Sequence, residues 1–213
     1  MAKQPCAVCG KLVGLWSASS FTGDRQPICN RCASKSNLYF STSEHALEEY
    51  YAHLRQMEDA NRIFEALLKP RINFKQGSEG WASKRQIKKY HKDEKVKLYG
   101  TNLWAIEDYG LFFYHSYQHR QNLKRGEDGN RSLIFRFSDL LSYRYIVETV
   151  SASDDTSLHI IELTFNNSYL LNEIRVSVNN RGMYQVFDDY FKDIVNGDKK
   201  QWDMLADQAL AKV

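Results

Sequence analysis

Apolar residues between positions 47 and 68 recur at alternating steps of three and four, which predicts an amphipathic helix. Ser41 followed by Glu44 fits a capping box at its start, and Pro70 fits its end. The same positions form a heptad seam with one polar member, and a lone Asn in such a seam can fix the register of a coiled coil. The seam consists of Leu47, Tyr50, Leu54, Met57, Asn61, Phe64 and Leu68.

Two packings of this helix remain open. It can lie on a sheet of its own chain, or residues 43–69 can pair with a second copy as a homodimer. Tyr51 and Leu67 widen the apolar face beyond a strict seam, which favours packing on the same chain.

Beyond residue 95 the pattern changes to the alternation typical of strands. We expect strands at 95–99, 103–107, 111–116, 132–137, 142–150, 157–165 and 172–178, with helices near 182–195 and 200–211. An aromatic content of 13% and only three prolines agree with a sheet-rich region. The fold class is therefore α+β, with consecutive antiparallel strands followed by helices.

The 213 residues suffice for a small module joined to a domain of ordinary size. We predict three parts, namely a module at 1–38, a linking helix at 39–75 and a β-rich domain at 76–213. No apolar run is long enough to span a bilayer, and the N-terminus has no apolar core of a signal peptide. We therefore expect a cytoplasmic protein.

All four cysteines fall in two CxxC pairs near the N-terminus, Cys6 with Cys9 and Cys29 with Cys32, separated by 19 residues. This spacing is typical of four-cysteine zinc sites, and Gly10 suits the turn that brings both sulfurs of one pair to a single ion. The segment between the pairs is predicted to be a short hairpin. Four ligands leave no open position, so one structural Zn(II) is the favoured interpretation. Redox chemistry and disulfides remain weaker alternatives, since a reducing compartment disfavours disulfides.

The stretches CAVCGKLVGL and ICNRCASK resemble a small zinc-ribbon domain at the N-terminus of uncharacterised bacterial and phage proteins. The resemblance covers roughly residues 6–35. It implies zinc binding by Cys6, Cys9, Cys29 and Cys32, and it associates the chain with phage-host interaction or regulation.

The segments EDYGLFFYHS, SLIFRFSDLLSYRYIVET and SLHIIELTF, followed by a terminal helix, resemble bacterial pleckstrin-homology-like (PH-like) domains. The resemblance implies an antiparallel barrel or roll that a C-terminal helix closes, and a scaffold that binds lipid headgroups, peptides or proteins. A generic β-sandwich or α+β roll is the alternative.

Basic residues gather in two places. Residues 69–97 carry ten basic and three acidic side chains, and a predicted short helix within them places lysines on one face. A long loop after residue 116 adds further cations, which suit phosphate or carboxylate. The candidate contacts for an anion or nucleic acid are Lys84, Arg85, Lys88, Lys89, Lys92, Arg120, Lys124 and Arg125. A solvated surface is the alternative for both segments.

No known catalytic motif occurs, and the six histidines are scattered. We therefore expect a non-enzymatic adaptor that contains zinc and binds a protein partner through the PH-like domain. A nucleic-acid-binding module that uses the ribbon and residues 84–97 is the alternative, and an unfamiliar enzyme is the weakest one.

Overall fold

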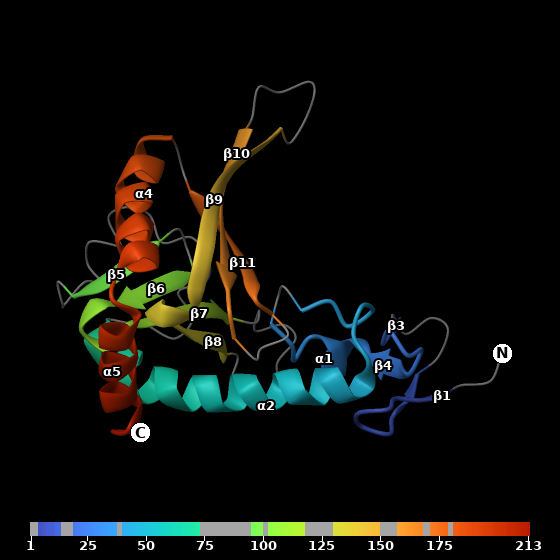
Figure 1. Ribbon diagram of the computed structural model, residues 1–213. Helices are drawn as coiled ribbons and strands as arrows, with labels where there is room; N and C mark the ends of the chain where they lie inside the picture. Colours follow the sequence, from blue (N-terminus) through green and yellow to red (C-terminus); the bar gives the residue numbers. More distant parts are fainter. Residues whose placement is uncertain are drawn as a thin grey trace. The chain divides into compact units, whose positions relative to one another are not determined.

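The computed structural model describes residues 4–13, 19–37, 40–72, 95–99, 102–117, 130–149, 157–167, 171–178 and 181–213. These residues form a mixed helix and sheet fold (Figure 1). The chain divides into two compact units. The first comprises Met1–Asn61, Ser116–Ser132 and Tyr169–Leu171, and the second comprises Arg62–His115, Leu133–Ser168 and Asn172–Val213.

The first unit begins with two small strand pairs. Strand β1 (Gln4–Pro5) pairs with β2 (Leu12–Val13), and β3 (Ser19–Phe21) pairs with β4 (Pro27–Cys29), which leads into the short helix α1 (Asn30–Ala33). The hairpin predicted between the cysteine pairs is present as β3 and β4, with its turn at the predicted residues 22–24, whereas β2 pairs with β1 outside it. Each strand pairs across the nearest turn, where the closure entropy is smallest.

Helix α2 (Leu47–Ile63) follows and has the predicted amphipathic character. Its start differs from the prediction, because Ser41 and Glu44 form a separate turn before the helix. The backbone amides at the start of α2 donate to the carboxylates of residues other than the predicted capping pair. The Ala46 amide donates to Glu49 Oε2 over 2.7 Å, and the Leu47 amide donates to Asp24 Oδ1 over 3.2 Å.

The end of this helix is set by Pro70, as predicted. The chain widens into a π-helical turn, η1 (Phe64–Leu68), and then tightens into a 3-10 turn, η2 (Lys69–Arg71). Proline has no amide to donate and its ring crowds the preceding turn, so the regular α-helical ladder cannot continue through it.

The heptad seam is largely buried within the chain. Tyr50, Met57, Phe64 and Leu68 are at most 3% exposed. The polar member, Asn61, accepts a hydrogen bond from the Ser132 amide over 2.9 Å. These contacts favour the packing of α2 on its own chain, while dimerisation through residues 43–69 stays a prediction.

The second unit contains a four-stranded sheet in the order β5-β6-β7-β8, in which β5 with β6 and β6 with β7 pair antiparallel. The strands are β5 (Val96–Tyr99), β6 (Leu103–Ile106), β7 (Leu111–Tyr117) and β8 (Asn130–Arg136), close to the predicted ranges. The turn between β6 and β7 contains η3 (Glu107–Tyr109) and ends at Gly110, whose φ of 59° lies in the left-handed region that favours glycine.

A second antiparallel sheet has the order β11-β10-β9. It consists of β9 (Leu140–Thr149), β10 (Ser157–Phe165) and β11 (Glu173–Val178). The prediction of a closed barrel is wrong for the described residues, since both sheets are open. The 3-10 turn η5 (Phe137–Asp139) redirects the chain after β8, so that β9 begins a new sheet.

Two helices complete this unit, α4 (Arg181–Asn196) and α5 (Lys199–Leu210), again near the predicted positions. The core between helices and sheets is aromatic. The Phe112 ring lies 4.4 Å from Phe137, 5.9 Å from Phe165 and 6.1 Å from Phe191, measured between centroids. Among the described helices, none combines the length and the apolar character that crossing a membrane requires.

Candidate metal centre

The first CxxC turn follows β1 and is closed by backbone hydrogen bonds. The Cys6 amide donates to the Lys11 carbonyl and the Gly10 amide donates to the Cys6 carbonyl, each over 2.8 Å. Gly10 has a φ of 71°, which a residue with a Cβ rarely adopts. The glycine therefore allows the chain to reverse so that Cys6 and Cys9 face one point.

The second CxxC turn joins β4 to α1. Cys29 is the residue before the first helical position, and Cys32 lies inside the short helix and is buried. Two hydrogen bonds hold the turns together. The Ala7 amide donates to the Pro27 carbonyl over 2.8 Å, and the Cys29 amide donates to Cys6 Sγ over 3.3 Å.

The four sulfur atoms lie within 4.8 Å of one another. The Sγ atoms of Cys9 and Cys29 are 3.7 Å apart, and all four cysteines are free of disulfides. A disulfide needs about 2.05 Å between sulfurs, whereas four sulfurs about 2.3 Å from one zinc ion are separated by about 3.8 Å. The arrangement therefore fits a tetrahedral zinc site, as the cysteine spacing predicts.

The protein environment acts differently on two of these thiols. Burial tends to raise the pKa of Cys6, but amide donors from Cys29, Cys9 and Val8 lower it to about 6. Burial raises the pKa of Cys32, and its contacts with Cys29, Cys9 and Cys6 raise it further. Cys6 is thus prepared to bind as a thiolate, while Cys32 needs the charge of a bound cation to lose its proton.

Helix α2 packs directly against the cysteine cluster. The Tyr50 hydroxyl donates to the Cys32 carbonyl, and the Tyr51 hydroxyl donates to the Ala7 carbonyl over 3.2 Å. Burial raises the pKa of Tyr50, and the charge that Cys32 or Cys6 carries as a thiolate raises it further, so the hydroxyl stays a donor. The apolar core of this unit consists of Cys6, Val13, Ile28, Cys32, Phe40 and Tyr50.

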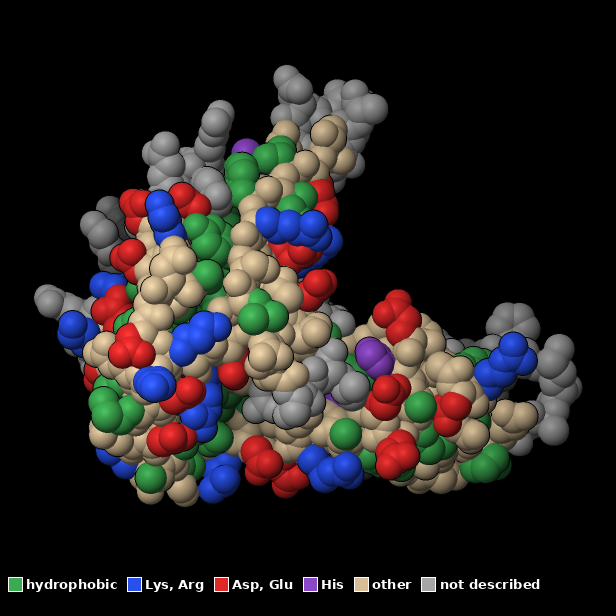
Figure 2. Space-filling model, in the orientation of Figure 1, with side chains coloured by type: hydrophobic (Ala, Val, Ile, Leu, Met, Phe, Trp, Pro, Cys, Tyr) green, Lys and Arg blue, Asp and Glu red, His purple; other side chains and the backbone are tan. Residues whose placement is uncertain are grey.

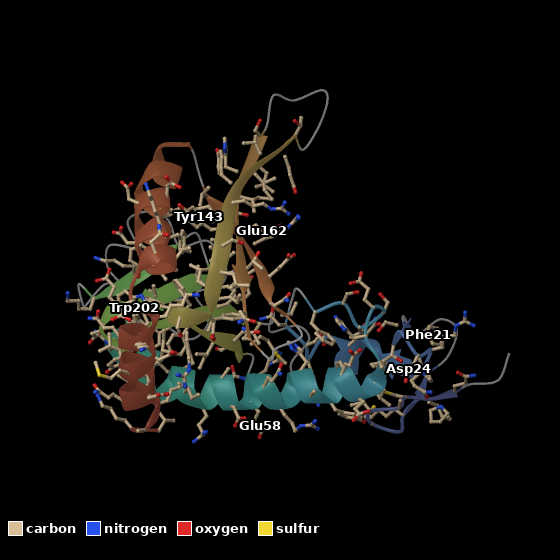
Figure 3. The ribbon with its side chains drawn as sticks, viewed as in Figure 1. Phe21, Asp24, Glu58, Tyr143, Glu162 and Trp202 are labelled. Atoms are coloured by element: carbon tan, nitrogen blue, oxygen red, sulfur yellow. The ribbon has the colours of Figure 1, made fainter. Side chains whose placement is uncertain are left out.

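Asp24 connects the β3–β4 turn to the start of α2, and the sequence did not indicate this role. It lies in the turn after β3 (Figure 3), where it accepts hydrogen bonds from the Thr22 hydroxyl and from the Leu47 amide. The Thr22 hydroxyl is the main cause of the lowered pKa of Asp24. The sequence signals a turn at 22–24 but contains no signal for its contact with a helix that begins 23 residues later.

A buried histidine lies near this centre. His53 Nε2 accepts a hydrogen bond from the Asn37 amide over 3.1 Å, and its ring stacks on Phe40 with centroids 4.2 Å apart. Burial, with a smaller contribution from His45, lowers the pKa of His53 to about 4. His53 is therefore neutral at physiological pH and acts as a packing residue.

The candidate anion contacts belong to two segments of the chain, residues 84–92 and 120–125. Lys84, Arg85, Lys88, Lys89, Lys92, Arg120, Lys124 and Arg125 all lie outside the described residues. Arg131, at the end of the predicted cationic loop, is described, and its carbonyl accepts from Asn37 Nδ2 over 3.1 Å. On the face shown in Figure 2, basic and acidic side chains of described residues are interspersed.

Comparison with protein-family models, with curated proteins and with solved structures finds no match for this chain. The metal centre therefore rests on its own geometry and chemistry.

Proposed function

We propose that this protein is a non-enzymatic adaptor in which one structural zinc ion organises the first unit and a PH-like domain binds a protein partner. The observation that carries the proposal is the cluster of four sulfurs within 4.8 Å. Four cysteine ligands fill a tetrahedral shell, so the ion contributes folding free energy and leaves no position for a substrate or water.

The order of elements in the second unit supports a PH-like scaffold. A sheet of four strands, β5 to β8, is followed by one of three strands, β9 to β11, and then by α4, which packs on β9. The Tyr143 hydroxyl on β9 donates to the Asp188 carboxylate on α4 over 2.8 Å. A scaffold of this kind acts through its surface, and the fold alone does not name the ligand.

Exposed apolar side chains support a protein partner. Val147 and Leu158, near the end of the β9–β10 hairpin, are 51% and 38% exposed, and Phe21 on the ribbon is 49% exposed. Burial of such side chains against a partner is favourable by about 25 cal/mol per Å² of apolar surface.

The test is a pull-down with the full chain as bait, combined with measurement of zinc content. We expect one zinc ion per chain and a protein partner that survives nuclease treatment. Leu158→Glu tests the second unit and Phe21→Glu tests the ribbon, while Met204→Glu is the control, because Met204 is an apolar residue on α5 that is 53% exposed, at least as exposed as the other two. The partner is expected to be lost with Leu158→Glu and retained with Met204→Glu.

Two results would contradict the proposal. If the purified chain contains no zinc, the proposed structural zinc ion is absent and the proposal fails. Recovery of nucleic acid instead of protein, with an affinity that falls steeply as salt rises, supports the alternative of a nucleic-acid-binding module.

A further inference from the structure

Strand β9 is the terminal strand of its sheet. In the part of the chain that the structure describes, the three-stranded sheet has the order β11-β10-β9, so β9 pairs with β10 on one side only. At ten residues it is long for a terminal strand. No other described strand pairs with its outer side, so this side can serve as a template for a further strand.

Beyond its first two residues, this edge lacks the prolines, lysines and bulges that usually block such pairing. The sequence of β9, LLSYRYIVET, contains neither proline nor lysine. The only register irregularity with β10 lies at its beginning, opposite Phe165, and the ladder from Ser142 to Thr149 is regular. Leu141 and Val147 are 49% and 51% exposed. The strand from Ser142 to Thr149 thus has a regular register with β10 and carries one exposed apolar side chain, Val147, while Leu141 lies at the irregularity.

The sequence of β9 is complementary to itself in the antiparallel direction. When two copies cross at Ile146, Arg144 of each lies opposite Glu148 of the other. The same register places Tyr145 opposite Val147, an aromatic and β-branched pair, and Tyr143 opposite Thr149. A shift by one residue would reverse the sheet faces, and a shift by two would remove both charge pairs.

The charged members of this register are accessible. Arg144 donates to Glu162 on β10, yet its side chain is 67% exposed. Glu148 accepts from Arg175 on β11 over 3.2 Å, and its side chain is 45% exposed. These contacts hold Arg144 and Glu148 on the sheet face that also carries Glu162. Tyr143 lies on the opposite face, where it contacts α4, and Figure 3 labels both Glu162 and Tyr143.

We propose that two copies of this chain associate through β9, about a two-fold axis at Ile146, to form a continuous six-stranded antiparallel sheet. Such an interface is isologous, so it closes at a dimer. It goes beyond the proposed adaptor function because it needs no other protein, and it uses a different surface from the predicted seam of α2, whose central residues are buried.

The mass of the purified full chain, measured by light scattering across a range of concentrations, tests this proposal. We expect a concentration-dependent dimer. Glu148→Lys places a lysine opposite Arg144 of the second copy twice per dimer, and it should raise the dimer dissociation constant at least about tenfold. Ile146→Lys places two like charges against each other on the axis and should have a similar effect. Glu173→Lys is the control, since it makes the same charge change on β11 of the same sheet.

A wild type that is monomeric at every concentration overturns the proposal. A dimer that survives both Glu148→Lys and Ile146→Lys also overturns it, because the interface then lies elsewhere. Hydrogen exchange of the wild type gives a test that does not depend on variants. Alternate amides of residues 142–149 should become more protected as the concentration rises while those of β11 do not, and unchanged protection in β9 contradicts the interface.

Discussion

Individual residues of the cysteine cluster differ in their dependence on metal. Cys6 has a pKa lowered to about 6 by backbone donors, whereas Cys32 is buried and its pKa is raised. Without a cation, the first unit would hold a buried protonated thiol beside a thiolate. A bound metal would therefore change the protonation of Cys32 more than that of Cys6.

Replacement of Cys32 by serine should abolish stoichiometric zinc binding, because a serine oxygen is a poor ligand for the ion in a four-sulfur site. We expect the zinc content, measured by mass spectrometry of the metal, to fall from one ion per chain to a small fraction. Arg31→Ser, in the same short helix, should keep its zinc. Full occupancy in Cys32→Ser would contradict the assignment.

His53 should make the protein less stable in acid. Its pKa is lowered from 6.5 to about 4, so the unfolded chain binds a proton more readily than the folded one between these values. The stabilisation that neutral His53 gives the folded state is complete above pH 6.5 and is lost as the pH falls toward about 4. The loss amounts to about 3 kcal/mol in the free energy of unfolding.

The measurement is urea unfolding at a series of pH values for the wild type and for His53→Gln, which keeps an acceptor for the Asn37 amide but does not titrate. Loss of zinc in acid affects both proteins, so the difference between them isolates the histidine. If the free energy of unfolding of the wild type and of His53→Gln changes equally with pH, His53 is not the cause of the acid sensitivity.

At the scale of elements, the strands and helices of the second unit follow from periodicity, because alternation and turn residues are local properties. The start of α2 does not. Its first amides are satisfied by Glu49 and by Asp24, and the Asp24 contact joins residues 23 apart in the chain. A local capping motif at Ser41 was therefore overridden by a tertiary contact.

The turn between β6 and β7 depends on Gly110. A Cβ at this position would lie 2.9 Å from the backbone carbonyl oxygen of Trp202 on α5, and φ is 59°. We expect Gly110→Ala to lower the free energy of unfolding by about 1–3 kcal/mol, measured by urea denaturation.

Gly110→Asn separates the two causes. Asparagine tolerates the left-handed conformation but still carries a Cβ, so the contact with α5 predicts that this variant is also destabilised. Stability equal to that of the wild type in both variants would rule out a close approach at this turn.

At the scale of the whole molecule, the two units differ in what holds them together. The core of the first includes two of its four clustered cysteines, Cys6 and Cys32, whereas the core of the second consists of packed aromatic rings between sheets and helices. Small modules with little apolar core depend on a metal or a disulfide for stability, and larger ones do not.

Removal of zinc by a strong chelator should therefore act selectively. We expect amides of residues 4–13 and 27–33 to lose protection from hydrogen exchange, while those of β6, β7 and β10 keep theirs. Restoration of zinc should reverse the change, and loss of protection across both units would show that they do not unfold independently.

The sequence by itself determined the α+β class, most strand and helix positions of the second unit and the four cysteines that come together. Each of these rests on local spacing, which the chain carries in any conformation. Tertiary structure alone decided the pairing of strand β1 with β2, the start of α2, the burial of its seam and the open sheets. These depend on contacts between distant residues, such as Asp24 with Leu47, and on which strand remains at an edge, and neither is encoded in any short stretch.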